Sequence, residues 1–373
     1  MKAKRRPRIL SLLFIFFLIP SIGLTQVDQI SKFMAGGVND AEQLFEAYIS
    51  PYANAIGADL SAGWYNTAKV HKPGGFDITL TANVAIIPES DQSFNLDDLD
   101  LTGTYTESIA PTAAGETNAG PAITYYQENP LTGDDVAIAS FNTPKGSGLR
   151  YTPAPMLQAS LGLFKGTEVM GRFTPELELG DAGTFSLWGV GLKHDVKQWI
   201  PGLKKFPVLH ISIMGGYTSM SSSTGLSMLP EFYNDFASYI EPYNENIYSG
   251  QEMAMNFTSY TGSILVSANL PVVCFYGGLG FSTSKAELNL NGLYPIASVE
   301  DNVSDPNFGQ VVVKEDDALE DPFSMEIKNT DGSTTNPRVN VGARLKFAVI
   351  TLHFDYTYAN YSVATAGLGI TFR

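Results

Sequence analysis

The sequence predicts an all-β protein, an antiparallel transmembrane β-barrel of 10 to 14 strands preceded by a short N-terminal helical segment. Three observations predict this fold class. The first residues have the composition of a secretory signal peptide, many later segments alternate apolar and polar residues, and the connections between these segments are alternately short and long. Bacterial outer-membrane barrels combine short periplasmic turns with long external loops in this way.

Residues 1–25 are expected to form a signal peptide that is cleaved near Thr25. Five Lys and Arg precede an apolar core from Ile9 to Ile22, and small or polar residues follow it. Cleavage removes five of the 23 Lys and Arg and none of the 38 Asp and Glu, so the net charge becomes -20. An acidic chain of this kind is not a nucleic-acid-binding protein. Its single cysteine, Cys274, excludes an internal disulfide framework.

Residues 26–75 are expected to form a helical plug or lid beneath the barrel. Asn39 followed by Glu42 fits a helix N-cap with its capping partner, and the spacing predicts one or two short helices that are interrupted at Pro51 and end near Gly57. An alternative is a helix that simply packs against the first strands. The apolar stripe of this segment supplies three plug candidates, Phe45, Tyr48 and Tyr52.

Residues 76–373 are expected to form the barrel, and alternation of apolar and polar residues predicts ten strands. The composition, with 22 Phe, 18 Tyr and 35 Gly, favours strands and turns over helices. Weaker signals at 99–107, 123–127 and 310–314 would raise the count to 12 or 14. The ten predicted strands are 76–87, 157–164, 167–173, 183–193, 207–219, 253–269, 272–283, 338–347, 349–359 and 362–372.

The lengths of the connections favour a membrane barrel over a water-soluble sandwich. Tight turns are expected at 165–166, 269–271 and 348–349, and the longer connection "HDVKQWIPGLKKFP" is the one exception on their side, whereas 88–156, 220–252 and 284–337 are long. Counted back from a periplasmic C-terminus, every tight turn falls on the periplasmic side and every long loop falls outside. A soluble sandwich has no reason to sort its loops in this way.

The last hairpin predicts a polar lumen. A two-residue turn at Ala348–Val349 pairs Arg344 with His353 and Lys346 with Thr351, and it also pairs residue 342 with Asp355. All of these polar side chains would face inward, where they form either an internal ion-pair network or a charged constriction that selects what passes.

Two acidic blocks lie in the predicted external loops. No Lys or Arg occurs from Pro73 to Pro144, and a second block precedes the last three strands. Clustered carboxylates can bind Ca²⁺ or Mg²⁺, although the glycine and regular spacing of a calcium loop are missing, so solvated loops are the alternative. The carboxylates considered for a cation are Asp97, Asp98, Asp100, Glu315, Asp316 and Asp317. No tightly bound cofactor is expected.

No enzymatic activity is expected from the sequence. The motifs of serine hydrolases, zinc peptidases and phosphate-binding loops are absent, and the chain has only four histidines. His353 and Asp355 form a close pair of catalytic residue types, and this pair would face the lumen.

Three stretches, "LGLFKGTEVMGRFTPEL", "GVGLKHDVKQWIPGLKKFP" and "DYTYANYSVATAGLGITFR", carry a resemblance to known proteins. Together they resemble an uncharacterised family of exported proteins of Bacteroidetes-type Gram-negative bacteria, known only as a domain of unknown function. More loosely, a signal peptide, a helical segment and a barrel resemble the long-chain fatty-acid transporter group. That resemblance implies a barrel plugged by its N-terminus that carries hydrophobic compounds.

These observations predict a protein of the cell outer membrane that allows passive transport of a small, hydrophobic compound, captured by the loop "GLSMLPEFYNDFASYI". The alternative is a non-transporting structural or surface-binding protein whose acidic loops bind cations or lipopolysaccharide. The expected partners are outer-membrane lipid, lipopolysaccharide and, during biogenesis, the barrel-assembly machinery.

Overall fold

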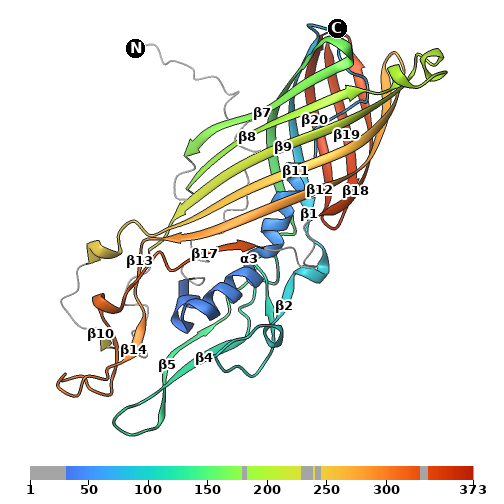
Figure 1. The fold of residues 1–373 in the computed structure, drawn as a ribbon. Helices are drawn as coiled ribbons and strands as arrows, with labels where there is room; N and C mark the ends of the chain where they lie inside the picture. The colour runs from blue at the N-terminus through green and yellow to red at the C-terminus, as the bar shows by residue number, and fades with distance from the viewer. Residues whose placement is uncertain (1–30, 179–182, 228–237, 240–244, 328–334, 373) are drawn as a thin grey trace, which may run out of the picture.

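The computed structural model describes residues 31–178, 183–227, 238–239, 245–327 and 335–372. Ten antiparallel strands form one closed sheet, because β11 and β12 pair with each other and complete the ring. Figure 1 shows this ring as a cylinder that holds part of α3 (Val38–Ser61), the only α-helix among the described residues. The ten barrel strands are β1 (Phe76–Ile86), β6 (Tyr151–Gly162), β7 (Thr167–Glu178), β8 (Thr184–Asp195), β9 (Leu209–Gly225), β11 (Glu252–Asn269), β12 (Val273–Asn291), β18 (Asn336–Phe347), β19 (Ile350–Tyr358) and β20 (Ser362–Phe372).

The prediction of a closed antiparallel barrel with an N-terminal helix is therefore confirmed, and each of the ten predicted strands occurs. The weaker strand signals do not add barrel strands. Residues 123–127 and 310–314 fall on β4 and β15, which pair outside the ring, and residues 99–107 contribute only an isolated bridge at Thr104. The barrel therefore has ten strands rather than 12 or 14.

The two ends of the barrel differ, and we name them by their connections. The turn end carries the tight turns 163–166, 270–272 and 348–349 together with the segment 196–208 and the last residue of β20. At the first of these turns Lys165 and Gly166 both have positive φ, a conformation that glycine adopts readily and that is uncommon for lysine. The loop end carries the long connections 87–150, 226–251 and 292–335.

Short elements fill the loop end beyond the ring, at the bottom of the view in Figure 1. Among them β17 pairs with the part of β12 that projects past the barrel. The strands at this end are β2 (Ser93–Asn95), β3 (Ile109–Pro111), β4 (Ala122–Glu128), β5 (Asp135–Asn142), β10 (Ser238–Tyr239), β13 (Leu293–Tyr294), β14 (Ala297–Val299), β15 (Val311–Val313), β16 (Leu319–Glu320) and β17 (Phe323–Ile327). In the described part of the chain the 3₁₀ helices are η1 (Ser31–Gly36), η2 (Glu89–Asp91), η3 (Leu96–Asp98), η4 (Phe164–Gly166), η6 (Lys197–Trp199), η7 (Leu203–Lys205), η9 (Glu245–Tyr248) and η10 (Glu315–Asp317).

Helix α3 corrects three predictions about the N-terminal segment. It is one continuous helix of 24 residues that runs through Pro51, and Asn39 lies inside it, because the N-cap is Gly37 and no side chain caps it. Buried residues on both sides of Pro51 hold the helix together, since tertiary packing rather than propensity supplies most helical stability. Gly57 does not end the helix. A Cβ there would lie 2.4 Å from Ser284 Oγ, so the glycine allows close approach to β12.

The outer face of the barrel is apolar. Large exposed side chains recur at every second position of the strands, including Leu80, Val190 and Ile264. Exposed aromatic residues gather near the turn end, and they are Phe76, Phe164, Trp199, Phe206, Phe347 and Phe372. A second set lies farther along the strands toward the loop end, and it consists of Tyr151, Trp188, Tyr260, Phe281 and Tyr358. From residue 350 to residue 358 a strand tilted as in outer-membrane barrels rises roughly 20 Å, which is close to the apolar band of such proteins.

Candidate functional site: a polar lumen threaded by the chain

The inward face of the barrel is polar but buried. On β1 the inward residues are Asp77, Thr79, Thr81 and Asn83, and on β19 they include Thr351. Thr351 has no exposed surface, and the others are at most 5% exposed. Side chains that line a water-filled channel remain accessible to solvent, so something other than water fills this lumen.

The filling is the chain itself, which enters as the end of α3 and continues as residues 62–75 to the start of β1. Leu60, Trp64, Tyr65 and Ala68 of this stretch are all buried. The stretch contributes no strand to the sheet, so its backbone groups need partners on the barrel wall. We call residues 62–75 the lumenal segment.

Two arginines of the wall bind the C-terminal carbonyls of α3. Arg172 on β7 donates from Nη1 to Leu60 O at 3.0 Å and from Nη2 to Ala62 O at 2.6 Å, while Arg338 on β18 donates from Nη1 to Ser61 O at 2.7 Å. These carbonyls have no partner within the helix, and they carry the negative end of its dipole. Guanidinium groups therefore satisfy both the hydrogen bonds and the charge at the point where the helix ends inside the barrel.

Trp64 occupies a niche formed by paired glycines. Gly191 on β8 faces Gly216 on β9, and a Cβ on either would lie 2.7 Å from the indole. The Arg172 guanidinium carbon lies 3.8 Å from the centre of the Trp64 ring on another side. A cation over an indole face is attractive, and more so away from water. The absence of two side chains therefore creates the space, and Arg172 joins Trp64 to the helix end.

An ionic cluster holds the lumenal segment near the turn end. Glu168 accepts from Lys193 Nζ at 2.9 Å and lies 2.7 Å from His71 Nδ1, and the other ring nitrogen of His71 lies 2.9 Å from Thr371 Oγ1. Glu168 and Lys193 are each no more than 3% exposed. Loss of one member would leave an uncompensated buried charge, so the cluster fixes the segment just before it enters β1. Cys274, the single cysteine, is also buried and faces inward at this end.

The sequence predicted the register of the last hairpin correctly. Arg344 pairs with His353, Lys346 pairs with Thr351 and Asp355 pairs with residue 342. Three of the four predicted network residues are buried in the lumen, but Lys346 is exposed at the turn end.

The side chains of this network do not form hydrogen bonds with the side chains that they face across the hairpin. Arg344 donates to Asn66 of the lumenal segment at 2.9 Å and forms an ion pair with Asp77 at 3.5 Å. Asp355 accepts from Tyr276 and from Asn340 at 2.8 and 2.7 Å, and neither ring nitrogen of His353 has a hydrogen-bond partner among the described residues.

The sequence reasoning missed most of the residues that hold the lumenal segment. The alternation in "FDITLTANV" places Asp77 and Asn83 on the inward face and could have identified both. No local signal shows that Arg172 or Glu168 would meet residues about 100 positions away. The buried lumen contains equal numbers of basic and acidic side chains: the basic ones are Arg172, Lys193, Arg338 and Arg344, and the acidic ones are Asp59, Asp77, Glu168 and Asp355.

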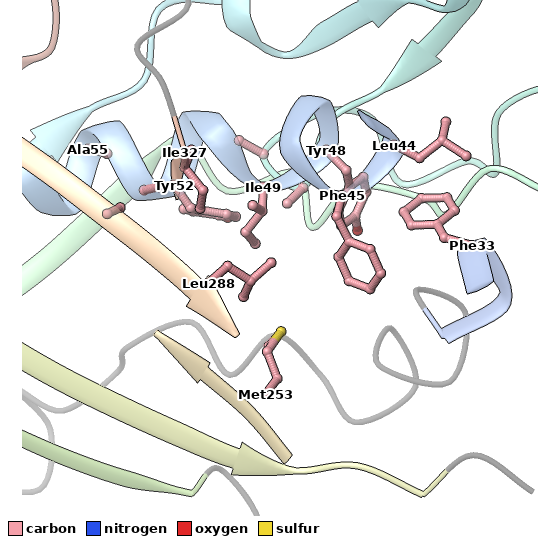
Figure 2. Close-up of a cluster of buried hydrophobic side chains, with 14 of the residues drawn as sticks. Phe33, Leu44, Phe45, Tyr48, Ile49, Tyr52, Ala55, Met253, Leu288 and Ile327 are labelled. Carbon is pink, nitrogen blue, oxygen red and sulfur yellow. The ribbon is translucent and has the colours of Figure 1, made fainter. Parts of the chain in front are cut away.

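The plug candidates Phe45, Tyr48 and Tyr52 lie at the loop end, outside the narrow part of the lumen. Figure 2 shows them on α3 beside Phe33, Leu288 and Met253. Tyr48 donates to Lys145 O and Tyr52 to Leu149 O, both at 2.9 Å. Burial raises the pKa of both phenols. These residues join the helix to the loop end, whereas the lumenal segment fills the barrel.

The acidic loop residues form two separate groups, exposed except for the half-buried Asp317. Asp97, Asp98 and Asp100 lie in and after η3, and the Asp97 carboxylate accepts from Tyr105. Glu315, Asp316 and Asp317 form η10, where Asp317 accepts from Ser298. Within the described residues, no group of three or more His, Cys, Asp and Glu side chains is arranged to hold a metal ion. Binding of Ca²⁺ or Mg²⁺ stays a prediction.

Two sequence predictions fall outside the described part of the chain. They are the signal peptide, residues 1–25, and most of the capture loop, of which residues 228–237 and 240 are not described. Among the described helices, none has the length and apolar character needed to cross a membrane.

The fold and the lumen together define a class: a ten-stranded β-barrel filled by its own N-terminal segment. The chain belongs to a family of unknown function (DUF6588), whose model matches residues 1–372. No curated protein sequence matches this chain.

Several solved structures are similar over most of the chain. The translocator domain of the autotransporter NalP from Neisseria meningitidis is 9% identical, with 91% of this chain and 99% of that chain covered and a TM-score of 0.29. The attachment invasion locus protein Ail of Yersinia pestis is 11% identical, with 80% and 99% covered and a TM-score of 0.25. The toluene transporter TodX of Pseudomonas putida is 9% identical, with 87% and 97% covered and a TM-score of 0.25. Because the TM-scores are low, no function is transferred from these proteins.

Proposed function

We propose that this protein is a closed outer-membrane barrel that presents its loop end at the cell surface as a binding surface. One observation carries the proposal: the polar side chains that face the lumen are buried, and several of them, including Arg172, Glu168 and Arg344, bind the lumenal segment. Thr351 and Ser212 have no exposed surface, and His353 is 1% exposed. A barrel filled in this way serves as an anchor, and the function lies in what the anchor displays.

The apolar outer face supports the membrane location. Backbone groups of a closed barrel are all paired within the sheet, so the barrel can enter lipid without unsatisfied hydrogen bonds. Exposed aromatic side chains at two heights match the girdles that such barrels place at the two membrane interfaces. In this proposal the turn end faces the periplasm, lipopolysaccharide surrounds the loop end, and the barrel-assembly machinery inserts the protein.

The first test is conductance across a planar lipid bilayer. The mature protein is expected to insert without steady ion conductance, and a variant that lacks residues 31–72 is expected to conduct because the lumen is then empty. Heat-modifiable mobility on a gel checks that both proteins are folded barrels. Steady conductance of the unmodified protein would refute the closed lumen.

The second test concerns orientation. Leu131, between β4 and β5, is 67% exposed at the loop end, and Trp199 is 68% exposed at the turn end. A cysteine introduced at each position is treated with a membrane-impermeant maleimide on intact cells. Labelling of Leu131→Cys but not of Trp199→Cys is expected, and the opposite pattern would reverse the proposed orientation.

Passive transport of a small hydrophobic compound is the second candidate. One observation favours it: side chains of the wall hold the lumenal segment from residue 62 to residue 73, and sheet hydrogen bonds reach it only at Gly74 and Gly75, so most of it could leave without breaking the barrel. Deletion of residues 26–60 tests this candidate, because removal of the helix should then give conductance or sensitivity to hydrophobic antibiotics. Reduced stability with no new permeability would exclude it.

Enzymatic activity is not part of the proposal. A general base has to contact the group that it activates, but His353 and Asp355 are both buried among lumenal residues, and Asp355 is occupied by Tyr276 and Asn340.

A further inference from the structure

A cavity of about 280 Å³ opens at the loop end between α3 and the rim of the barrel. Asn54 and Ala58 of the helix form one wall, and β12 contributes Ser282 and Ser284 to another. The remaining lining residues are Pro88, Ser90, Asp91, Asn336, Ala359, Asn360 and Tyr361. Segments distant in the sequence thus meet around one cavity.

The chemistry of the lining is that of hydroxyls and amides. Eight of the eleven lining residues carry a polar side chain, none is Lys or Arg, and Asp91 is the only charged one. Asp91 accepts from Tyr361 and from Ser90, and Asn360 donates to Asn336. These bonds fix several of the groups in place before any ligand arrives.

Asn54 gives the independent indication of a ligand. Its side chain lines the cavity and is only 8% exposed, and its Nδ2 has no hydrogen-bond partner. Buried amide donors are almost always paired, because an unpaired one loses its interaction with water without replacement. The Nδ2 itself has almost no accessible surface, so rotation of the amide by 180° would turn it toward the cavity, where a ligand that accepts a hydrogen bond would restore the missing interaction.

From this cavity we infer a binding site for one neutral sugar ring. The lining offers donors and acceptors in several directions, as a ring with several hydroxyl groups needs, and Pro88, Ala58 and Tyr361 add apolar surface. Asp91 and the lack of basic residues oppose an anionic ligand, and the many polar groups oppose a purely hydrophobic one. The volume is at the lower end of small-molecule sites and suits a single ring.

Such a ring could be a free monosaccharide or the terminal unit of a neutral glycan. The inference deepens the proposed function, since a glycan-binding site at the loop end gives the displayed surface a ligand class. Binding to purified protein in detergent does not depend on orientation or on closure of the lumen. Its failure would therefore leave the proposed surface role to be judged by conductance and labelling.

The experiment is saturation-transfer nuclear magnetic resonance on the purified mature protein. The probes are glucose, galactose and mannose, neutral trisaccharides of each, and sialic acid as the anionic comparison. We expect at least one neutral sugar to bind at millimolar concentration and sialic acid not to bind. Equal affinity for a monosaccharide and its trisaccharide would indicate a free sugar, and tighter binding of the trisaccharide would indicate a glycan end.

Asn54→Ala and Asn54→Leu are expected to weaken binding about tenfold, the effect of one hydrogen bond. Their unfolding midpoints should not fall, because the Asn54 amide has no protein partner to lose. Asn39→Ala is the matched control, since Asn39 lies on the same helix but is exposed and outside the cavity. Absence of neutral-sugar binding, or binding unaffected at Asn54, would overturn the inference.

Discussion

Replacement of Arg172 by alanine tests how the end of α3 is held in the lumen. Arg172 is 3% exposed and donates two hydrogen bonds to the carbonyls of Leu60 and Ala62. Hydrogen bonds to a charged group contribute about 1.5–3 kcal/mol each, and the contact with Trp64 adds about 1 kcal/mol. The alanine variant also avoids the desolvation penalty of burying a guanidinium, which offsets part of this loss.

Arg172→Ala is expected to lower the free energy that holds the lumenal segment in its site by about 3 kcal/mol, while the stability of the sheet stays unchanged. The population in which the segment leaves its site should then rise roughly a hundredfold. Arg172→Lys keeps the charge but loses the paired donors, so it should show an intermediate effect.

The measurement is hydrogen exchange of residues 60–70 in detergent, with single-channel recording to detect transient openings. Faster exchange is expected in this segment, while the amides of the neighbouring strands β7 and β8 keep their protection. Arg150→Ala is the control, because Arg150 is exposed at the rim. Unchanged exchange in Arg172→Ala would refute the account of how the helix end is held.

Three further predictions concern packing and titration. Gly216→Val should displace the indole of Trp64, lower the free energy of unfolding by about 1–3 kcal/mol and shift the tryptophan emission. Gly215→Val is the control and should fold normally, because a Cβ there meets only one atom, at 3.9 Å. Tyr48→Phe should lower the free energy of unfolding in urea by about 1 kcal/mol, because it removes one hydrogen bond. Burial raises the pKa of Tyr48, so the wild type should lose stability above about pH 10, the usual pKa of tyrosine. A flat stability profile at alkaline pH would contradict this. The hydrogen bond from Lys314 lowers the pKa of Glu300, so the contact stabilises the loop above about pH 4.3, the unfolded value, and is lost as the pH falls through the folded value. Lys314→Met should remove this acid dependence from the hydrogen exchange of residues 297–314, and an unchanged profile would show that the pair is not responsible.

The barrel could be predicted because its information is local. A strand with one face in lipid and one in the lumen alternates with a period of two, and each of the ten strands carries that pattern in its own residues. The register of β18 and β19 followed from the same pattern and a two-residue turn. The loop strands were less predictable, because short strands that pair outside the ring have the same composition as barrel strands.

The N-terminal helix shows where local reasoning fails. Pro51 and Gly57 are helix-breaking signals in sequence, but α3 continues through both. Tertiary contacts make the helix continuous, and local sequence rules do not include them. They are the burial of side chains on either side of Pro51 and the close approach of Ser284 to Gly57. Propensities of about 1 kcal/mol for glycine and 3 kcal/mol for proline are small beside the burial of a whole helical face.

The sequence by itself determined the ten strands, the polar lumen and the sorting of short turns and long loops. Each of these depends on residues near one another in the chain. Only the tertiary structure decided that Arg172 and Arg338 bind the end of α3 and that Asn54 faces a polar cavity. These contacts join residues more than 100 positions apart, or depend on one unpaired amide, so they become visible only when closure of the barrel brings its wall and the N-terminal segment together.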